Sequence, residues 1–330
     1  MQVEVPEYGS ADVFRLSSLN PDTIQLAEDE VLVQNTYAGV NFIDTYFRSG
    51  LYKKSHLPFV PGEEGAGGVV RVGAAVQTLR AGQRVMYFGS QSGSYATHTV
   101  VKAAQANVLP DGVDDKTAAA ICCQGLTAHY LTHDSYVCGP NSRVLVHAAA
   151  GGTGLLVCQL AKLRGAVVVG VCGNGEKAEI ARRVGHADHV IDSSTTMDWA
   201  AAARLIFPDG FDAVYDGVGR STFDGSLSVL RPRGYMISFG NASGAVEGVT
   251  PLRLMQAGSV YLQRPTLSDY IRDPEEKRRR LDELWGLIRE NKLQLTCGRE
   301  FPLKAAADAH KYLESRQSTG KILLQCNSTE

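Results

Sequence analysis

The stretch that most constrains the fold runs from Arg143 to Gly173, where two apolar runs flank a turn of small residues and a helical pattern. The first run, Val144–His147, predicts a short buried strand. The leucines after the turn recur at helical spacing until Gly165, and Val167–Cys172 then predicts a second strand. A strand, a glycine turn, a helix and a parallel strand within about 30 residues form the unit that holds a dinucleotide.

The turn in this unit has the spacing A-x-x-G-x-x-G, counted from Ala148 through Gly151 to Gly154. Residues without side chains let backbone N–H groups approach a pyrophosphate, and the positive end of the helix dipole stabilises that anion. We therefore expect Gly151, Gly152, Thr153 and Gly154 to bind the pyrophosphate of a dinucleotide. The alternative is an ordinary tight turn between a strand and a helix.

The composition excludes several classes of protein. The chain of 330 residues has 33 Lys and Arg against 35 Asp and Glu, so its net charge of −2 does not indicate a nucleic-acid or acidic-membrane partner. The seven cysteines form no C-x-x-C pair, and their odd number favours reduced thiols. The N-terminal segment has no signal-peptide pattern, and polar residues interrupt the apolar stretch 144–161, so we expect a cytosolic protein without a membrane span.

Two kinds of pattern divide the chain. Residues 1–122 contain short apolar runs between Gly, Pro and Asp turns and no long helical pattern, which predicts a compact β-rich domain. After Cys123, six strands alternate with helices, which predicts an α/β domain with a doubly wound parallel sheet. The tail returns to mixed α and β and is expected to pack on the first domain. We therefore expect one domain of residues 1–123 and 266–330 and another of residues 124–265.

Four stretches carry a resemblance to a known family: Asn41–Tyr52, Pro61–Gly67, His147–Gly154 and Phe239–Gly244. They are similar to the NADPH:quinone oxidoreductases, the zinc-independent, zeta-crystallin-like branch of the medium-chain dehydrogenases/reductases. The resemblance implies a GroES-like catalytic domain in two segments, a Rossmann domain between them, and usually a homodimer. It also implies that NADPH reduces a small quinone in the interdomain cleft. The chain departs from the family pattern at Ser142 and at Ser193.

The choice of cofactor depends on the residues after the second predicted strand. In proteins that bind NAD, an acidic residue about 20 positions after the glycine turn binds the ribose 2′-hydroxyl. Here Gly173 occupies this place and leaves room for a 2′-phosphate, and Lys177 can supply positive charge. By resemblance, Gly173, Asn174 and Lys177 would contact that phosphate, which favours NADPH. The alternative is that Lys177 is a simple surface lysine. In the bacterial relatives a tyrosine helps to bind this phosphate, and Ser193 at the matching position weakens the preference for NADPH.

A catalytic zinc needs about three protein ligands, usually Cys or His. The chain also resembles zinc alcohol dehydrogenases, but Asn41 replaces their first ligand cysteine and Glu63-Glu64 replaces their His-Glu pair. Cys123 falls near their third ligand, and their four-cysteine lobe is missing because residues 86–95 contain no cysteine. We therefore expect no catalytic metal, and Cys123 is read most simply as a small buried residue.

Without a Lewis acid an alcohol is a difficult substrate, whereas a quinone is already electron-poor and needs mainly to be positioned. By resemblance, Asn41 and Tyr46 line the cleft for the nicotinamide and the substrate, where a hydroxyl could steady a developing phenolate. Thr127 is a lesser candidate for a nicotinamide contact, and Tyr130 for the cofactor groove. The alternatives are a buried aromatic residue for Tyr46 and the start of a linking helix for Thr127 and Tyr130.

Further residues follow from the predicted sheet. Phe239, Gly240 and Asn241 follow a parallel strand at its carboxyl end, where ligands of such sheets bind, and Gly217 lies on the same rim. By resemblance the sixth strand, residues 258–264, pairs across a two-fold axis, which would cover an apolar strand edge. Two other functions remain open: an NADPH-dependent reductase of activated C=C bonds, and a non-enzymatic crystallin-like or RNA-binding role.

Overall fold

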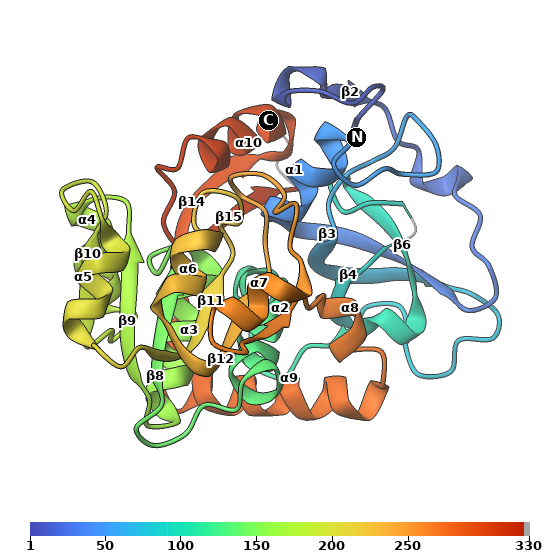
Figure 1. Cartoon of the computed structure of the whole chain (residues 1–330). Helices are drawn as coiled ribbons and strands as arrows, with labels where there is room; N and C mark the ends of the chain where they lie inside the picture. The colour runs from blue at the N-terminus through green and yellow to red at the C-terminus, as the bar shows by residue number, and fades with distance from the viewer. Residues whose placement is uncertain (91, 327–330) are drawn as a thin grey trace. The chain divides into compact units, whose positions relative to one another are not determined.

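The computed structural model describes residues 1–90 and 92–326, and the contacts among them divide the chain into two compact units (Figure 1). The first unit contains Met1–Cys123 and the segment from Cys297 onward, and the second contains Gln124–Thr296. The boundary at Cys123 coincides with the expected one. Residues 266–296 group with the second unit, although the sequence analysis assigns them to the first.

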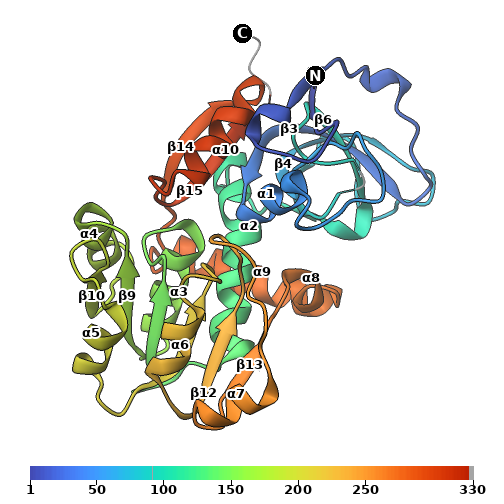
Figure 2. The same cartoon turned by 45° about the horizontal axis from the view of Figure 1, so that its top comes forward.

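The second unit is built on one sheet of six parallel strands, in the order β10-β9-β8-β11-β12-β13. Figure 2 shows the strands running from β10 at one edge to β13 at the other. The central strands β8, β9 and β11 are buried along most of their length, as expected for a sheet that is covered on both faces. The predicted doubly wound sheet is confirmed. Its strands are β8 (Arg143–His147), β9 (Val167–Cys172), β10 (His189–Asp192), β11 (Phe211–Asp216), β12 (Leu230–Ser238) and β13 (Tyr261–Gln263).

Helices cover the two faces of this sheet. On one face Leu145, Val169 and Met236 pack against residues of α5 and α6, including Ala203 and Phe223. The side chains that alternate with them along the strands point to the opposite face, and α3 and α4 contact the strands β8 to β10. The helices are α3 (Gly152–Leu163), α4 (Gly175–Arg183), α5 (Trp199–Ile206), α6 (Phe223–Val229), α7 (Pro251–Gln256), α8 (Leu267–Tyr270) and α9 (Pro274–Arg289).

The first unit is built on a seven-stranded sheet in the order β14-β15-β3-β4-β5-β7, with β6 also paired to β3. The C-terminal strand β15 adds antiparallel to β3, so the end of the chain completes the N-terminal sheet. The strands are β3 (Glu30–Val40), β4 (Glu64–Val72), β5 (Arg84–Phe88), β6 (His98–Lys102), β7 (Ala106–Val108), β14 (Cys297–Pro302) and β15 (Lys321–Gln325), with a separate pair β1 (Gln2–Glu4) and β2 (Arg15–Ser17).

The helices of the first unit are short. They are α1 (Phe42–Ser49), α10 (Ala306–Glu314) and the 3-10 turns η1 (Ala11–Val13), η2 (Pro21–Thr23), η3 (Ala103–Gln105) and η5 (Leu303–Ala305). One buried cluster packs α10 against β3 and β15 through Ala309, Ala38 and Leu324. None of the helices within residues 1–90 and 92–326 is long and apolar enough to cross a bilayer.

One helix begins earlier than the sequence indicates. α2 (Asp115–Tyr130) starts within the region where no long helix is expected, and the boundary between the units falls inside it. Its run of Ala118, Ala119 and Ala120 has high helix propensity but no polar face, so an amphipathic pattern does not reveal it. A π-helical turn, η4 (Leu131–Ser135), continues the helix.

Candidate cofactor-binding and active site

The glycine turn lies where β8 ends and α3 begins, at the carboxyl edge of the parallel sheet. Gly151 is the residue before the first helical turn, with extended backbone (φ −74°, ψ 167°), and its N–H donates to the carbonyl of Ala148 over 2.8 Å. Ala148 has a left-handed φ of 49°, a conformation that costs a residue with a side chain about 1–2 kcal/mol. The strained turn carries the chain directly from the strand into the helix.

The glycines of this turn are required for different reasons. A Cβ atom added to Gly154 would lie 2.3 Å from the carbonyl oxygen of Ala148, so this glycine is needed for the fold. A Cβ atom on Gly152 would lie 1.9 Å from the side chain of Gln124. A Cβ atom on Gly151 would meet only the oxygen of Ala148, at 3.1 Å. Among the glycines of this turn, packing therefore constrains Gly151 least.

The candidate 2′-phosphate residues lie between β9 and α4. Asn174 caps α4, because its Oδ1 accepts the N–H of Lys177 over 2.9 Å. A Cβ atom on Gly173 would meet nothing within 4 Å, so the space beside this residue is open. Burial lowers the pKa of Lys177. The three expected residues lie together at the start of α4.

Two residues at the end of β10 adjoin this place. The N–H and the hydroxyl of Ser193 both donate to the carbonyl of Cys172, over 2.8 and 2.9 Å. Asp192, which the sequence analysis does not single out, has a carboxylate oxygen 3.6 Å from where a Cβ of Gly175 would stand. Hydrogen bonds from Ser194 lower the pKa of Asp192, so the carboxyl is ionised. The negative charge of Asp192 would oppose that of a 2′-phosphate. Its position at the end of the third apolar strand is the sequence signal that could have identified it.

The loops after β11 and β12 pack tightly against each other. The N–H of Phe239 donates to the carbonyl of Asp216 over 2.8 Å, and the N–H of Ala242 donates to the carbonyl of Gly217 over 3.3 Å. A Cβ atom on Gly240 would lie 2.4 Å from the oxygen of Gly217, so contact between the loops already requires this glycine. Asn241 follows in the same loop, and these residues share one edge of the sheet.

Asp216 fixes the first of these loops. The carboxylate is buried and accepts the N–H groups of Val218 and Gly219 over 2.8 and 3.0 Å. It also accepts the hydroxyl of Ser226, which is 2.9 Å from Nε2 of the buried His147. His147 and Asp216 therefore hold the carboxyl ends of β8 and β11, and neither needs to touch a ligand to do so.

Thr127 and Tyr130 lie on α2 and are both buried. The ring of Tyr130 stacks on that of Tyr270, with ring centres 4.1 Å apart and planes 7° apart. One face of the Tyr130 ring is thus covered by another aromatic ring. Thr127 and Tyr130 both lie in the last turn of α2, so the alternative in which they begin a helix is wrong.

Asn41 and Tyr46 belong to the first unit, at the start and in the middle of α1. The backbone N–H of Asn41 donates to Oδ2 of Asp44 over 2.8 Å, and its side-chain amide donates to Oε1 of Glu64 over 2.6 Å. The ring of Tyr46 is 7% exposed and meets Tyr52 edge to face, with ring centres 5.3 Å apart. The helix start therefore fixes the direction of the Asn41 amide.

A buried polar cluster surrounds the Asn41 amide. The ammonium of Lys321, from β15, donates to Oδ1 of Asn41 over 2.8 Å and pairs with the carboxylate of Glu64. The other oxygen of Glu64 accepts the N–H of Cys123 over 2.5 Å. Burial, with the charge of Glu64 next, raises the pKa of the Cys123 thiol well above its ordinary value. The sequence analysis missed Lys321, whose contacts lie about 280 positions away along the chain.

The comparisons with known proteins cover both units. Residues 27–141 match the alcohol dehydrogenase GroES-like domain, and residues 186–324 match the zinc-binding dehydrogenase family. A quinone oxidoreductase of Pseudomonas aeruginosa is 40% identical over 325 residues, which are 98% of each chain. The Escherichia coli quinone oxidoreductase, solved in complex with NADPH, is 40% identical with a TM-score of 0.94, over 98% of this chain and 99% of that one. A 2-haloacrylate reductase of a Burkholderia species is 36% identical, over 89% and 90% of the two chains.

A GroES-like unit joined to a Rossmann unit defines the medium-chain dehydrogenases/reductases. The identity extends over nearly the whole chain and both units. The chain belongs to the quinone oxidoreductase family within this superfamily.

The residues around Asn41 do not fit the zinc ion that the name of one matching family implies. An amide stands at Asn41, and the Glu64 carboxylate is already neutralised by the Lys321 ammonium. Cys123 is a single thiol, and one thiol cannot supply the three or so Cys or His ligands that a catalytic zinc needs. A buried ammonium beside the same carboxylate would also repel a divalent ion.

Proposed function

We propose that this chain reduces small quinones with NADPH. The observation that carries the proposal is a glycine turn open at Gly151, in a chain that aligns over 98% of its length with an NADPH-bound quinone oxidoreductase. The helix N-terminus behind the turn supplies N–H groups and partial positive charge for a pyrophosphate.

The second unit would bind the cofactor along the carboxyl edge of its sheet. Gly151, Gly152, Thr153 and Gly154 would bind the pyrophosphate. Gly173, Asn174 and Lys177 would contact the 2′-phosphate, beside Ser193, and Asp192 would reduce the preference for NADPH over NADH. The loops after β11 and β12 would border the nicotinamide ribose and the pyrophosphate, through Gly217, Phe239, Gly240 and Asn241, and Tyr130 would line the groove.

The bound cofactor supplies a hydride, and a quinone accepts it readily because reduction makes its ring aromatic. Asn41 would orient the nicotinamide or the substrate, since Lys321, Glu64 and its place at the start of α1 fix the amide. The hydroxyl of Tyr46 would stabilise the developing phenolate, and Thr127 would contact the nicotinamide. No step requires a Lewis acid.

The test is steady-state oxidation of NADPH with a panel of benzoquinones and naphthoquinones. We expect quinone-dependent turnover that NADH supports less well. The quinone panel should also be followed for semiquinone radical, which separates one-electron from two-electron transfer. Failure of every quinone to speed NADPH oxidation, with NADPH still bound, would refute the proposed substrate class while leaving the cofactor site in place.

The identity with a 2-haloacrylate reductase favours one alternative, the reduction of activated C=C bonds. Such a reaction would use the same cofactor site and the same hydride. Comparing turnover of a naphthoquinone with that of a simple enone and a haloacrylate separates the two. Faster turnover of the conjugated C=C substrates would support the alternative.

We also propose a homodimer that forms through β13, and a cytosolic location. β13 lies at the edge of the sheet, and Leu252, Met255 and Tyr261 on or near it are exposed apolar side chains. An unpaired apolar edge is a surface that a second copy can cover. Tyr261→Glu should give a monomer by light scattering if the proposal is right.

The seven cysteines are free thiols, which suits a reducing compartment such as the cytosol.

A further inference from the structure

The side-chain amide of Asn41 belongs to a ring of three polar contacts within the first unit. The ammonium of Lys321 donates to Oδ1 of Asn41 over 2.8 Å, and Nδ2 of Asn41 donates to Oε1 of Glu64 over 2.6 Å. The ammonium also pairs with this oxygen of Glu64, which closes the ring. Asn41, the most exposed of the three, is only 7% exposed, so water does not replace these contacts. A Cβ atom on Gly39 would lie 2.2 Å from Oε1 of Glu64, so β3 leaves room for this carboxylate.

The charges of the two neighbours fix which end of the Asn41 amide is the oxygen. An ammonium can only donate, so it must face Oδ1, and an ionised carboxylate can only accept, so it must face Nδ2. Turning the amide over would place its oxygen against the carboxylate of Glu64 and its NH₂ group against the ammonium of Lys321. Both contacts would then be repulsive. The ion pair therefore determines both the plane and the direction of the amide.

The ammonium of Lys321 is fully used inside the protein. It has three hydrogens, and besides its two contacts in the ring it donates to the carbonyl oxygen of Val40 over 3.4 Å. The other oxygen of Glu64, Oε2, accepts the backbone N–H of Cys123 over 2.5 Å. The ammonium thus has no hydrogen left for a ligand, and its effect on a ligand can only pass through the side chain that it orients.

One hydrogen of the ring remains unused. Nδ2 of Asn41 carries two hydrogens, of which one goes to Glu64, and among residues 1–90 and 92–326 no group accepts the other. Oδ1 of Asp44, on the helix that Asn41 begins, is buried but has no partner, so it does not accept this hydrogen. A buried donor without an acceptor costs about 1–3 kcal/mol, and a bound ligand that supplies an acceptor removes this cost. The ring therefore presents one N–H donor in a fixed direction.

We propose that Lys321 and Glu64 are positioning residues that make Asn41 a fixed N–H donor to the quinone oxygen on which negative charge develops. This inference rests on the proposed quinone reductase function and adds a second donor to the hydroxyl of Tyr46. In that reaction the quinone accepts one hydride, which brings two electrons. The displaced electron pair goes to a carbonyl oxygen of the quinone, and this oxygen then takes one proton from solvent to complete the hydroquinone.

A fixed donor contributes most where charge appears during the reaction. Such a donor needs no reorganisation when the oxygen becomes anionic, and removing one typically slows the chemical step about 10²–10³-fold. The carboxamide oxygen of a nicotinamide gains no negative charge when the hydride leaves, so a donor to that oxygen would affect binding of the cofactor and not the rate of transfer. The developing phenolate is therefore the acceptor that suits the Asn41 amide.

The test measures hydride transfer in a single turnover of the full chain and, separately, NADPH binding by fluorescence. Asn41→Leu should slow hydride transfer at least about a hundredfold and leave the dissociation constant of NADPH unchanged.

The positioning role is tested by the double variant Lys321→Met with Glu64→Gln, which keeps Asn41 but frees its amide to turn. Uncharged groups of similar volume can replace a buried ion pair without loss of stability, so its melting temperature should stay close to that of the wild type. Its hydride transfer should slow at least about tenfold. The matched control is Lys116→Met with Glu300→Gln, which removes a partly exposed ion pair of the same unit and should leave hydride transfer at the wild-type rate.

A readout other than turnover is the carbonyl stretching band of a quinone bound together with NADP⁺, followed by infrared spectroscopy. A hydrogen bond to the oxygen lowers this frequency, so the band should lie lower in the wild type than in Asn41→Leu. Equal band positions, or hydride transfer at the wild-type rate in Asn41→Leu or in the Lys321 and Glu64 double variant, would overturn the inference. Weaker NADPH binding by Asn41→Leu with an unchanged transfer rate would assign the N–H to the cofactor and overturn it as well.

Failure of this inference is distinguishable from failure of the proposed function. If the wild-type chain reduces no quinone, the proposed function is wrong, whatever the Asn41 variant does. If the wild-type chain reduces quinones and the Asn41 and double variants do so equally fast, only the role of the fixed amide is wrong.

Discussion

Gly151→Val tests the cofactor site without disturbing the fold. The backbone at Gly151 is extended, a conformation that valine favours, and the added Cβ would meet only the oxygen of Ala148, at 3.1 Å. The neighbouring atoms would shift by a few tenths of an ångström, so we expect the free energy of unfolding to change by less than about 1 kcal/mol. The new side chain would stand where the pyrophosphate is expected.

The expected loss of binding follows from the hydrogen bonds that the turn can make. A hydrogen bond to a charged group contributes about 1.5–3 kcal/mol. Blocking two of them would cost at least about 3 kcal/mol, which weakens NADPH binding at least about a hundredfold. Gly154→Ala is the matched control, because it is expected to lower the stability of the fold, whereas Gly151→Val is expected to lower NADPH binding. Its Cβ would lie 2.3 Å from the oxygen of Ala148, so overpacking should cost about 1–3 kcal/mol of stability.

The assay is a fluorescence titration with NADPH, paired with thermal unfolding of each variant. Gly151→Val should melt close to the wild type and bind NADPH poorly, whereas Gly154→Ala should melt at a lower temperature. Wild-type affinity in a fully folded Gly151→Val chain would refute the reasoning, because the open face of the turn would then have no ligand.

Four further predictions follow from the same geometry. Lys177→Ala should raise the Michaelis constant for NADPH at least about tenfold and that for NADH little, because the charge-assisted contact is to the 2′-phosphate; equal effects would exclude this role. Asp192→Asn should improve NADPH binding severalfold in low salt, by removing a like charge, and a salt-independent result would argue against it. Chelator dialysis should leave quinone turnover intact, and a loss restored by Zn²⁺ would contradict the conclusion that the residues around Asn41 do not fit a zinc ion. Burial raises the pKa of Asp44 from 3.8 to about 8. The stability that its protonated form supports is therefore complete below pH 3.8 and is lost as the pH rises through about 8, by at most about 6 kcal/mol. Urea unfolding of Asp44→Asn should lack this fall, and identical pH profiles would refute the assignment.

The sequence predicted the Rossmann unit closely because its signals are local. The strands at 143–147 and 167–172 and the helix between them follow from apolar spacing and from the glycine turn. The tail was also expected to pack on the first domain, but its pattern does not show that β15 completes the sheet of the first unit. Elements whose own residues set their conformation are the ones that a single sequence can place.

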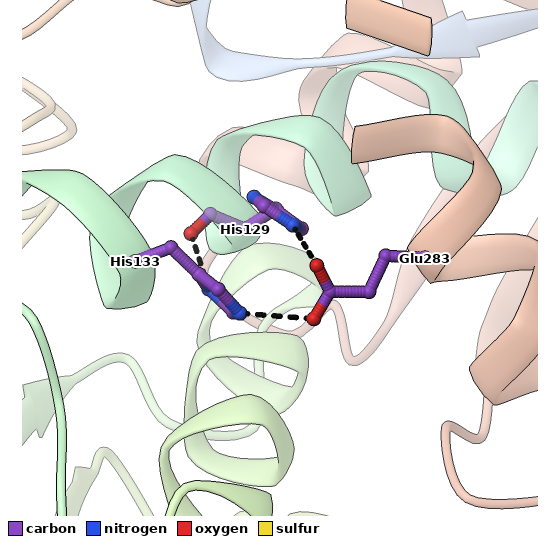
Figure 3. A group of neighbouring side chains, drawn as sticks. All are labelled: His129, His133 and Glu283. Carbon is purple, nitrogen blue, oxygen red and sulfur yellow. Dashed lines mark hydrogen bonds and ion pairs between the residues drawn. The ribbon is translucent and has the colours of Figure 1, made fainter. Parts of the chain in front are cut away.

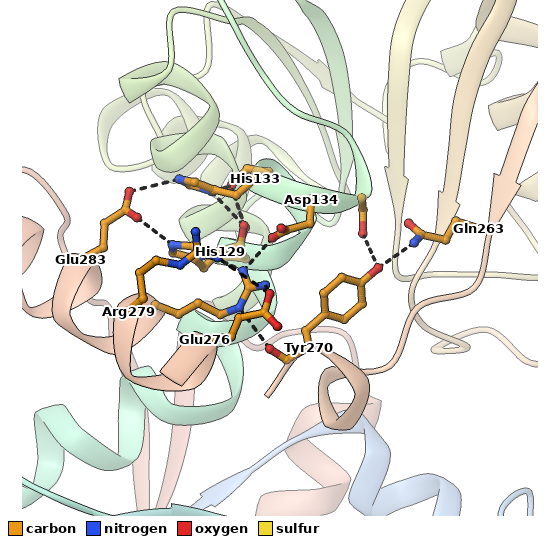
Figure 4. A network of polar contacts seen from close by, with 12 residues as sticks. His129, His133, Asp134, Gln263, Tyr270, Glu276, Arg279 and Glu283 are labelled. Carbon is orange, nitrogen blue, oxygen red and sulfur yellow. Dashed lines mark hydrogen bonds and ion pairs between the residues drawn. The ribbon is translucent and has the colours of Figure 1, made fainter. Parts of the chain in front are cut away.

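Sequence patterns predict less where residues far apart in the chain decide the structure. Residues 266–296 join the second unit because α9 pairs with the end of α2 and the turn after it. Glu283 pairs with His129 (Figure 3). Arg280 pairs with Asp134, which lies beside His129 in Figure 4. No local pattern in the sequence predicts these pairs. The cluster of Asn41, Glu64 and Lys321 likewise depends on the C-terminal strand returning to β3.

The central claim, that a metal-free site passes a hydride from NADPH to a quinone, is tested most directly by a single anaerobic turnover. Chelator-treated protein carrying one NADPH per chain is mixed with one equivalent of a naphthoquinone, and the nicotinamide absorbance is followed. The account predicts rapid loss of that absorbance with one hydroquinone formed per NADPH. Absorbance that persists until Zn²⁺ is added would contradict it.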